Sequence, residues 1–312
     1  MNTAGTDSSA EAPEENSHRC GYVAIVGRPN VGKSTLMNRI LGQKLSIVTA
    51  KPQTTRQRIT GIKSTPGGQV VYVDTPGIHL AAKRALNRYM NRIAQAAFHD
   101  VDLVLFMVEA DRWTREDEFV ARALTSVGAP VWLVLNKIDL VADKSRLLRF
   151  VSEDVGAERF PETLMIAART GDGVADLERR VFEVLPFSRP LYDEDQFTDR
   201  SERFLVAERI REKLFRKLGR ELPYGITVEI ERFRRERNII HIHALIWVER
   251  QSQKAIVIGR QGRVLKEVGR EARTEIESLL DSRVNLKLWV KVKEGWADDE
   301  RALRSLGYLD ED

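Results

Sequence analysis

Eight consecutive residues near the start of the chain, 27–34, place two glycines, a lysine and a serine in the pattern G-x-x-x-x-G-K-S. In such a loop the backbone N–H groups and the start of the following helix converge on one concavity, which favours a polyphosphate. Gly27 and Gly32 permit the tight turn and the close approach of the backbone. We therefore expect Lys33 to reach the β- and γ-phosphates of a nucleotide and Ser34 to hold Mg²⁺.

Two further motifs narrow the choice of nucleotide. Asp74 ends an apolar run and can hold Mg²⁺, directly or through water, while the N–H of Gly77 can bond a γ-phosphate. Asn136, Lys137 and Asp139 follow another apolar run. A carboxylate at Asp139 can accept from guanine N1–H and the exocyclic amine together, and adenine offers neither donor there. The three motifs in this order indicate a GTP site.

The surrounding pattern predicts the elements that position these motifs. Apolar runs typical of buried strands occur at 22–26, 58–64, 70–74, 103–109, 131–136 and 164–167. Helical patterns occur at 33–41, 83–98, 115–127, 144–156 and 174–185. This alternation predicts an α/β fold with a doubly wound sheet covered by helices on both faces. Ligands of such sheets bind beyond the carboxyl ends of the strands, where all three motifs fall.

The pattern changes after residue 186. A stretch with prolines and acids, 186–196, is expected to be a linker that permits two domain arrangements. Helices are then predicted at 202–218, 254–258 and 262–280, and strands at 226–235, 239–249 and 284–293, in the order α-β-β-α-α-β. Residues 259–262 resemble the Gly-x-x-Gly loop of KH domains, which lets the backbone of single-stranded nucleic acid approach closely. The residues expected to bind RNA are Lys254, Ile258, Gly259, Arg260, Gln261, Gly262, Arg263 and Lys266.

Charge and composition limit the class of protein. The whole chain has a net charge of +4, yet residues 200–293 carry 23 Lys+Arg against 13 Asp+Glu. Such a basic domain fits a polyanionic partner, although a solvated charged surface is an equal alternative on charge alone. Residues 1–18 are expected to form a disordered tail. The lone Cys20 and the lack of an apolar leader favour a reducing cytoplasm.

These motifs together resemble the Era branch of the translation-factor-like GTPases, over about residues 20–308. The resemblance rests on Asn30 within 27–34, on 74–77, on Pro52-Gln53-Thr54-Thr55-Arg56 as a first switch, and on the stretch 295–308. It implies a tail at 1–18, a P-loop GTPase domain at 19–188, a linker at 189–200 and an α+β type II KH domain at 201–312.

The resemblance also implies the activity and the partners. They are those of a monomeric, cytoplasmic, Mg²⁺-dependent GTPase that binds the 3′ end region of small-subunit (16S) ribosomal RNA and assists assembly of the 30S subunit. Loose peripheral contact with the cell membrane is a further implication. Its main sequence support is the basic helix with Arg209, Lys213, Arg216, Lys217 and Arg220, although a solvated face is the favoured interpretation of that helix. Trp296 is expected in the core, with base stacking as the alternative.

Site residues follow from the match with the family's motifs. Lys33, Gly77 and the two threonines Thr54 and Thr55 are expected to be catalytic, and Ser34, Asp74 and one of the threonines to bind the metal. The motif does not decide between Thr54 and Thr55. Nucleotide-binding residues are expected to be Gly27, Arg28, Pro29, Asn30, Val31, Gly32, Lys33, Ser34, Thr35, Asp74, Thr75, Pro76, Gly77, Asn136, Lys137, Asp139, Ala167, Ala168 and Arg169.

Two departures from the family pattern affect the chemistry. The last guanine motif is Ala167-Ala168-Arg169, so a serine hydroxyl is lost, although the Ala168 N–H is retained for guanine O6. Ile78 stands where a water-orienting glutamine is usual, so intrinsic hydrolysis should be slow unless a cation or a partner supplies charge. Asn30 is a candidate ligand for K⁺, and stabilisation of the loop is the alternative role.

Two other functions share parts of this pattern. A metabolic kinase or ATPase would also use the phosphate loop, but Asn136, Lys137 and Asp139 argue for guanine. An RNA-binding module with a degenerate nucleotide site is disfavoured by the intact Lys33 and Asp74. We therefore expect a switch in which the nucleotide state gates RNA binding.

Overall fold

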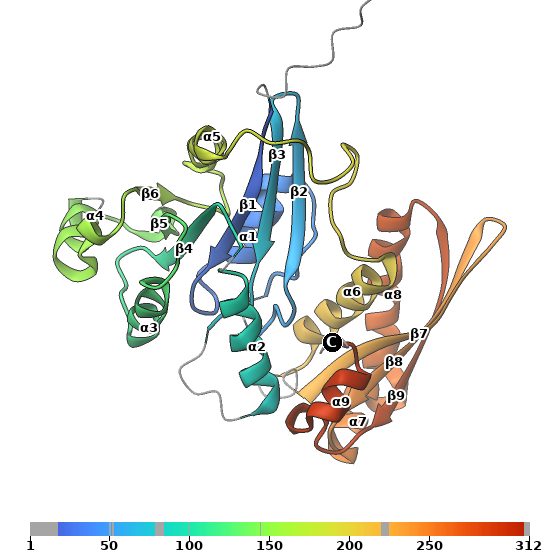
Figure 1. Ribbon diagram of the computed structural model, residues 1–312. Coiled ribbons are helices and arrows are strands. Elements are labelled where there is room, and N and C mark those ends of the chain that lie inside the picture. The colour runs from blue at the N-terminus through green and yellow to red at the C-terminus, as the bar shows by residue number, and fades with distance from the viewer. Residues whose placement is uncertain are drawn as a thin grey trace, which may run out of the picture.

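A computed structural model describes residues 18–49, 51, 53–78, 84–98, 100–143, 145–219 and 225–308 (Figure 1). The tail predicted at 1–18 lies outside the described residues apart from His18. Pro52 of the first switch, Arg220 of the basic helix and residues 309–312 also lie outside them.

The first domain is built on a six-stranded sheet with the order β2-β3-β1-β4-β5-β6. Strand β2 runs antiparallel to β3, and all other neighbours are parallel. The strands are β1 (Arg19–Val26), β2 (Ile59–Thr65), β3 (Gly68–Asp74), β4 (Leu103–Glu109), β5 (Val131–Asn136) and β6 (Thr163–Ile166). The apolar runs predicted these strands, and the doubly wound α/β fold is confirmed.

Helices cover both faces of this sheet because its central strands are apolar on both sides. Val23 and Ile25 of β1 pack in one core with α1 (Lys33–Leu41) and α5 (Val174–Val184). Ala24 and Val26 face the opposite core, with α2 (Ala85–Ala96), α3 (Arg115–Leu124) and α4 (Ser145–Arg149). The helix predicted at 144–156 is α-helical only in α4. It continues as a wider turn, Phe150–Val155, and ends where Gly156 adopts a left-handed φ of 64°.

The second domain is a three-stranded sheet with helices on one face. It consists of α6 (Glu202–Lys217), β7 (Ile226–Glu236), β8 (Ile239–Val248), α7 (Gln251–Ile258), α8 (Arg263–Leu280) and β9 (Arg283–Val292). β8 pairs antiparallel with β7 and parallel with β9. Alternate residues of β8, such as Ile242 and Ile246, join the core formed with α6, α7 and α8. This arrangement confirms the predicted order and the KH class.

Helix α6 lies between the two domains in Figure 1, and some of its cations are buried while others are exposed. Arg209 is 3% exposed and donates to the backbone carbonyls of Lys44 and Leu45 in the first domain. Lys213 is 4% exposed and pairs with Glu275 of α8. The solvated face expected for this helix is therefore wrong for Arg209 and Lys213, because burial requires each cation to find a partner. It is confirmed for Arg216 and Lys217 at the end of the helix, whose side chains are 50% and 33% exposed.

The C-terminal segment and the linker also join the domains. After β9, a short turn (Trp296–Asp298) and α9 (Glu300–Ser305) bring Trp296 and Tyr308 into one cluster with α2 of the first domain. Trp296 is fully buried, which confirms the expected core role. The linker follows β2: the carbonyl of Phe197 accepts from the Ile62 N–H at 2.9 Å, and the Thr198 hydroxyl donates to Thr60 O at 2.6 Å. In this arrangement the linker is fastened and is not a free spacer.

Candidate functional site

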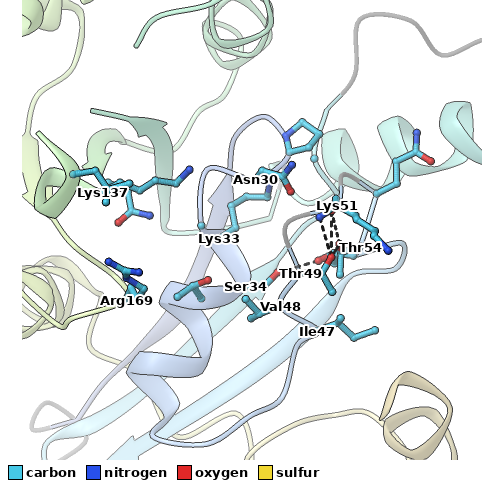
Figure 2. A pocket seen from close by; sticks show the side chains of 18 of the residues that line it. Asn30, Lys33, Ser34, Ile47, Val48, Thr49, Lys51, Thr54, Lys137 and Arg169 are labelled. Carbon is cyan, nitrogen blue, oxygen red and sulfur yellow. Dashed lines mark hydrogen bonds between the residues drawn. The ribbon is translucent and has the colours of Figure 1, made fainter. Parts of the chain in front are cut away.

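A cavity of about 470 Å³ opens beyond the carboxyl ends of the parallel strands, and Figure 2 shows it from close by. The phosphate loop, the first switch and the guanine motif all contribute to its wall, as the sequence predicted. Of the predicted residues, the lining includes Pro29, Asn30, Gly32, Lys33, Ser34, Thr35, Thr54, Thr55, Gly77, Asn136, Lys137, Asp139 and Arg169.

Some predicted residues lie behind this wall. Gly27, Arg28, Val31, Asp74, Thr75, Pro76, Ala167 and Ala168 are not among its lining residues. Gln53 of the first switch lines the cavity, and the structure adds lining residues that the motifs did not single out: Ile47, Val48, Thr49, Lys51 and Leu140. Most of these follow α1 in an irregular stretch, where no periodicity marks a side chain as facing inward.

Lys33 begins α1 and is held over the phosphate loop. Its Nζ donates to the carbonyls of Gly27 and Arg28, each at 2.9 Å. Burial lowers the pKa of Lys33 to about 8; the nearby Asp74 carboxylate opposes this shift, and Arg28 adds to it. A bound polyphosphate would stabilise the charged form of Lys33, which burial alone disfavours, so the site favours binding of a phosphate.

Three oxygen ligands meet beside Lys33. Ser34 Oγ donates to Asp74 Oδ2 at 2.7 Å and lies 3.0 Å from Thr55 Oγ1, which is 3.5 Å from the same Asp74 oxygen. The other carboxylate oxygen, Asp74 Oδ1, is buried and has no hydrogen-bond partner among the described residues. Burial raises the pKa of Asp74, while Lys33 and the hydroxyls oppose the shift. A hard oxygen set with an orphaned carboxylate oxygen fits Mg²⁺.

The two threonines that the sequence left open have different surroundings. Thr55 is 8% exposed and belongs to the oxygen cluster. Thr54 Oγ1 instead bonds the Thr49 hydroxyl at 2.8 Å and the Lys51 carbonyl at 2.6 Å, as drawn in Figure 2. Thr55 is therefore the threonine placed to meet a metal.

Asn136, at the end of β5, joins two loops. Its Nδ2 donates to Val31 O at 2.7 Å, and its Oδ1 accepts from the Ala168 N–H at 2.9 Å. Because this N–H is already used and Ala168 is 1% exposed, Ala168 does not present its N–H to the cavity as expected. Asn136 thus braces both loops through their backbones.

The expected guanine acceptor, Asp139, is in place at the cavity. Its Oδ2 accepts from Arg169 Nη2 at 2.9 Å, and its side chain is 15% exposed against 75% for Arg169. Lys137 has a left-handed φ of 68° and pairs with Glu109 at 3.2 Å. One carboxylate oxygen of Asp139 thus has a partner within the protein, and among the described residues the other has no hydrogen-bond or ion-pair partner.

Sequence reasoning missed the residues that brace the phosphate loop from behind. Arg28 donates to Glu109 at 2.7 Å and to Asp117 at 3.0 Å. Asp117 also forms the capping box of α3 with Thr114. Hydrogen bonds and charge from these two acids raise the pKa of Arg28, although its burial opposes this. An acid at the end of β4, in line with the other strand ends, is the signal that could have identified Glu109.

Ile78 and Asn30 are the two residues that bear on what replaces the missing catalytic glutamine. Ile78 is fully buried in the core with α2 and α3, so its position presents no polar group to water. Asn30 lines the cavity with a left-handed φ of 65° (Figure 2). A Cβ on Gly77 would lie 2.7 Å from Pro29 N, so this close approach of the two loops requires glycine.

A second hollow, of about 750 Å³, lies between α8 and β9. It contains Gly262, Arg263 and Lys266 of the predicted RNA site, together with Leu265, Glu267, Gly269, Arg270, Arg273, Leu286 and Leu288. Lys254, Ile258, Gly259, Arg260 and Gln261 are not part of its lining. We name it the α8–β9 groove. Its wall combines cations with leucines, as an unstacked base between phosphates would need.

Comparison with known proteins agrees with both domains. A family model described as 50S ribosome-binding GTPase matches residues 22–137, and a KH domain model matches 221–297. GTPase Era of Ectopseudomonas mendocina is 57% identical over 94% of this chain and 98% of its own length. GTPase Era of Azotobacter vinelandii is 55% identical over 95% and 99%.

Solved structures match over the same span. The crystal structure of Era in complex with MgGDPNP and nucleotides 1506–1542 of 16S ribosomal RNA has a TM-score of 0.90 and 37% identity, and the match covers 93% of this chain and 99% of that one. The crystal structure of a single-residue variant of Aquifex aeolicus Era bound to GDP·AlF4⁻ has a TM-score of 0.88 and 36% identity, with the same coverage. The chain belongs to the Era family of GTPases.

Proposed function

We propose that this chain is a Mg²⁺-dependent GTPase switch that binds the 3′ end region of 16S ribosomal RNA and assists assembly of the 30S subunit. One observation carries the switch. The segment of residues 51 and 53–57, which we name the joint segment, lines the nucleotide cavity at Thr54 and Thr55 and is bonded to the second domain on either side of them.

Nucleotide binding follows from the cavity. The guanine base lies against Asp139 and the stem of Lys137, and the phosphates lie over the loop 27–34, where Lys33 exchanges its two carbonyl partners for phosphate oxygens. Ser34, Thr55 and Asp74 would hold Mg²⁺, which supplies charge neutralisation at the β- and γ-phosphates. The Gly77 N–H faces the γ-phosphate.

Residues 19–188 and 201–312 are kept as the proposed bounds of the two domains.

Hydrolysis must proceed without a glutamine at position 78. Asn30 supports the proposal that a K⁺ ion beside the phosphates supplies part of the missing charge stabilisation. The test compares turnover in KCl and NaCl at equal ionic strength. Faster turnover in KCl that is lost in Asn30→Ala supports the ion. Equal rates in both salts would instead assign the role to a partner.

RNA binding is assigned to the α8–β9 groove and the loop before it. Gly259 and Gly262 have φ values of 73° and 75°, and a Cβ on Gly259 would meet Val264 Cγ2 at 2.5 Å. The loop therefore keeps a bare backbone where phosphates approach, flanked by Arg263 and Lys266. The first base enters the leucine-lined part of the groove.

The test of this function is RNA binding by two variants of one residue. Gly262→Asp should abolish binding of RNA with the sequence of nucleotides 1506–1542, because its charge repels the phosphates. Gly262→Asn should retain binding, since it has nearly the same shape and a Cβ here meets no atom within 4 Å. Both variants should bind GTP normally. Equal RNA affinity of the two variants would refute this placement.

Monomeric state, cytoplasmic location and peripheral membrane contact remain proposals of the same kind. None of the described helices is long and apolar enough to cross a membrane. Of the basic residues of α6, Arg209 and Lys213 are buried and give no support to membrane contact, while Arg216 and Lys217 at its end are exposed. Sedimentation of the chain with anionic vesicles tests such contact directly.

A further inference from the structure

The sheet of the second domain has one face that its helices leave uncovered. Register places cross-strand partners on the same face, and on this side His243 of β8 stands beside Lys287 of β9, and Trp247 beside Lys291. We name this side the open face. Its side chains include Glu229, Arg232, Arg234 and Glu236 of β7, His241, His243 and Trp247 of β8 with the buried Leu245, and Asn285, Lys287, Trp289 and Lys291 of β9.

Aromatic rings are exposed on this face at one centre. Trp289 is 41% exposed, and its ring meets the edge of the His243 ring with centroids 5.1 Å apart. Trp247 is fixed by its Nε1 donating to Glu229 at 2.7 Å. An indole with two-fifths of its surface in water offers a base a ring on which to stack.

Cations surround these rings. The ammonium groups of Lys291 and Lys293 lie 5.8 and 5.9 Å from the centre of the Trp247 ring. Among the described residues, neither Lys287 nor Lys291 has a carboxylate within ion-pair distance. The two acids of the face are engaged, Glu229 by Trp247 and Glu236 by Arg234 at 3.0 Å. Unpaired lysines beside a flat ring match the phosphates and bases of a single strand.

The open face is continuous with the α8–β9 groove. Leu286 and Leu288 line the groove, while their neighbours Lys287 and Trp289 point to the opposite side of the same edge strand. Because β9 is the edge of the sheet, an RNA strand that leaves the groove need only cross one strand to reach Trp289. A KH loop clamps about four nucleotides, so a longer RNA has chain left to make this crossing.

We propose that the open face is a second RNA-binding surface, which stacks an unpaired base on Trp289 and holds the adjoining phosphates with Lys287 and Lys291. The RNA continues from the groove around the edge of β9. This inference rests on the proposed RNA-binding function. It adds a subsite for the flanking nucleotides of the same RNA.

The experiment measures RNA affinity of the full chain with two probes: RNA of nucleotides 1506–1542, and single-stranded pieces of it shortened to about four nucleotides. Trp289→Ala should lower the affinity for the long RNA on the order of tenfold and leave the affinity for the shortest piece that still binds unchanged. Trp289→Phe should retain most of the affinity, since it keeps a ring. The control is Phe119→Ala on α3, which removes a ring that is 36% exposed, away from the second domain.

Salt dependence tests the phosphate contacts separately. The pair Lys287→Ala and Lys291→Ala should reduce the slope of log affinity against log salt by about 1.4, at about 0.7 for each phosphate contact of a single strand. Unchanged affinity and slope for the long RNA in these variants, while Gly262→Asp weakens both probes, would overturn the open-face subsite alone.

Two other outcomes are informative. If the variants change a monomer–dimer equilibrium in sedimentation and not the RNA affinity, the face is a contact between copies of the chain and the proposal is wrong. If Gly262→Asp weakens neither probe, the groove assignment in the proposed function fails. The open face is then judged by the Trp289→Ala result alone.

Discussion

Replacing Arg56 by methionine should uncouple the nucleotide from the RNA. Arg56 is the residue next to Thr55, yet its side chain enters the second domain and is 2% exposed. Nη1 donates to Ile226 O at 2.7 Å and approaches the Tyr308 hydroxyl at 3.4 Å. The guanidinium also lies 5.6 Å from the Phe215 ring and 5.9 Å from the Trp296 ring.

The magnitude follows from what methionine leaves behind. Tyr308 keeps its bond to Thr227 at 2.8 Å, but Ile226 O loses the charged donor that Arg56 supplies. A buried hydrogen bond to a charged group contributes about 1.5–3 kcal/mol, and cation–π contacts add about 0.5–1 kcal/mol. The contact between the domains should weaken by roughly 2–4 kcal/mol, which is about 30- to 900-fold in its equilibrium constant.

Other bonds of the joint segment remain in this variant. Lys51 caps the end of α6 by donating to Phe215 O and Leu218 O, and Arg211 Nη2 donates to Thr54 O at 2.6 Å. The fold should therefore persist, and GDP affinity should be unchanged. The variant loses the direct contact by which a shift of Thr55, where a metal would bind, can move Ile226 of the second domain.

The assay is RNA affinity measured with GDP and with a non-hydrolysable GTP analogue at one salt concentration. Coupled sites typically change each other's affinity 5- to 150-fold. The Arg56→Met variant should bring the ratio of the two affinities within about twofold of one. Arg58→Met is the matched control, because Arg58 is exposed two residues further along. A ratio that survives in Arg56→Met would refute the view that this segment carries the coupling.

Three further outcomes test the nucleotide site. Asp139→Asn should weaken GTP binding and favour binding of xanthosine triphosphate, since its amide presents a donor to the C2 carbonyl of xanthine. Unchanged GTP affinity would show that the base lies elsewhere. Lys33 has a pKa of about 8 in the free protein and must be protonated to hold phosphates, so GTP affinity should fall about fourfold from pH 7 to pH 8.5. The accompanying proton uptake should be measurable by calorimetry. A GTP affinity that does not change with pH would contradict this role of Lys33. Asn136→Ala should lower the free energy of unfolding by about 2–3 kcal/mol in urea, because Val31 O and the Ala168 N–H are left buried without partners, and a loss below about 0.5 kcal/mol would contradict the bracing.

The sequence predicted the elements whose residues interact locally. Loop 27–34 and the strand ends at Asp74 and Asn136 follow from short apolar runs and turn chemistry, so they could be placed without a structure. The choice between Thr54 and Thr55 could not, because adjacent residues of an irregular loop share no periodicity that separates inward from outward side chains.

Helix α6 was misjudged for a different reason. Composition and spacing mark Arg209 and Lys213 as surface residues, and a lone basic helix is normally solvated. Their partners, the carbonyl of Lys44 and the carboxylate of Glu275, are 165 and 62 residues away in the chain. Nothing in a local window can supply them, so the burial of this helix only becomes visible once both domains are folded.

The ion pairs between Lys44 of the first domain and the acids of α6 and α8 suit a reversible contact between the domains. Glu212 is fully buried, and Lys44 pairs with it at 2.5 Å and with Glu275 at 2.8 Å. Buried ion pairs gain little net stability, because the attraction between the charges is largely offset by the water they give up. When the domains part, each charge regains hydration, whereas an apolar joint of the same area would expose surface that water disfavours. We infer that these ion pairs fix the register of the contact and add little net stability to it, whereas the apolar cluster of Trp296 and Tyr308 with α2 buries the surface that holds the domains together.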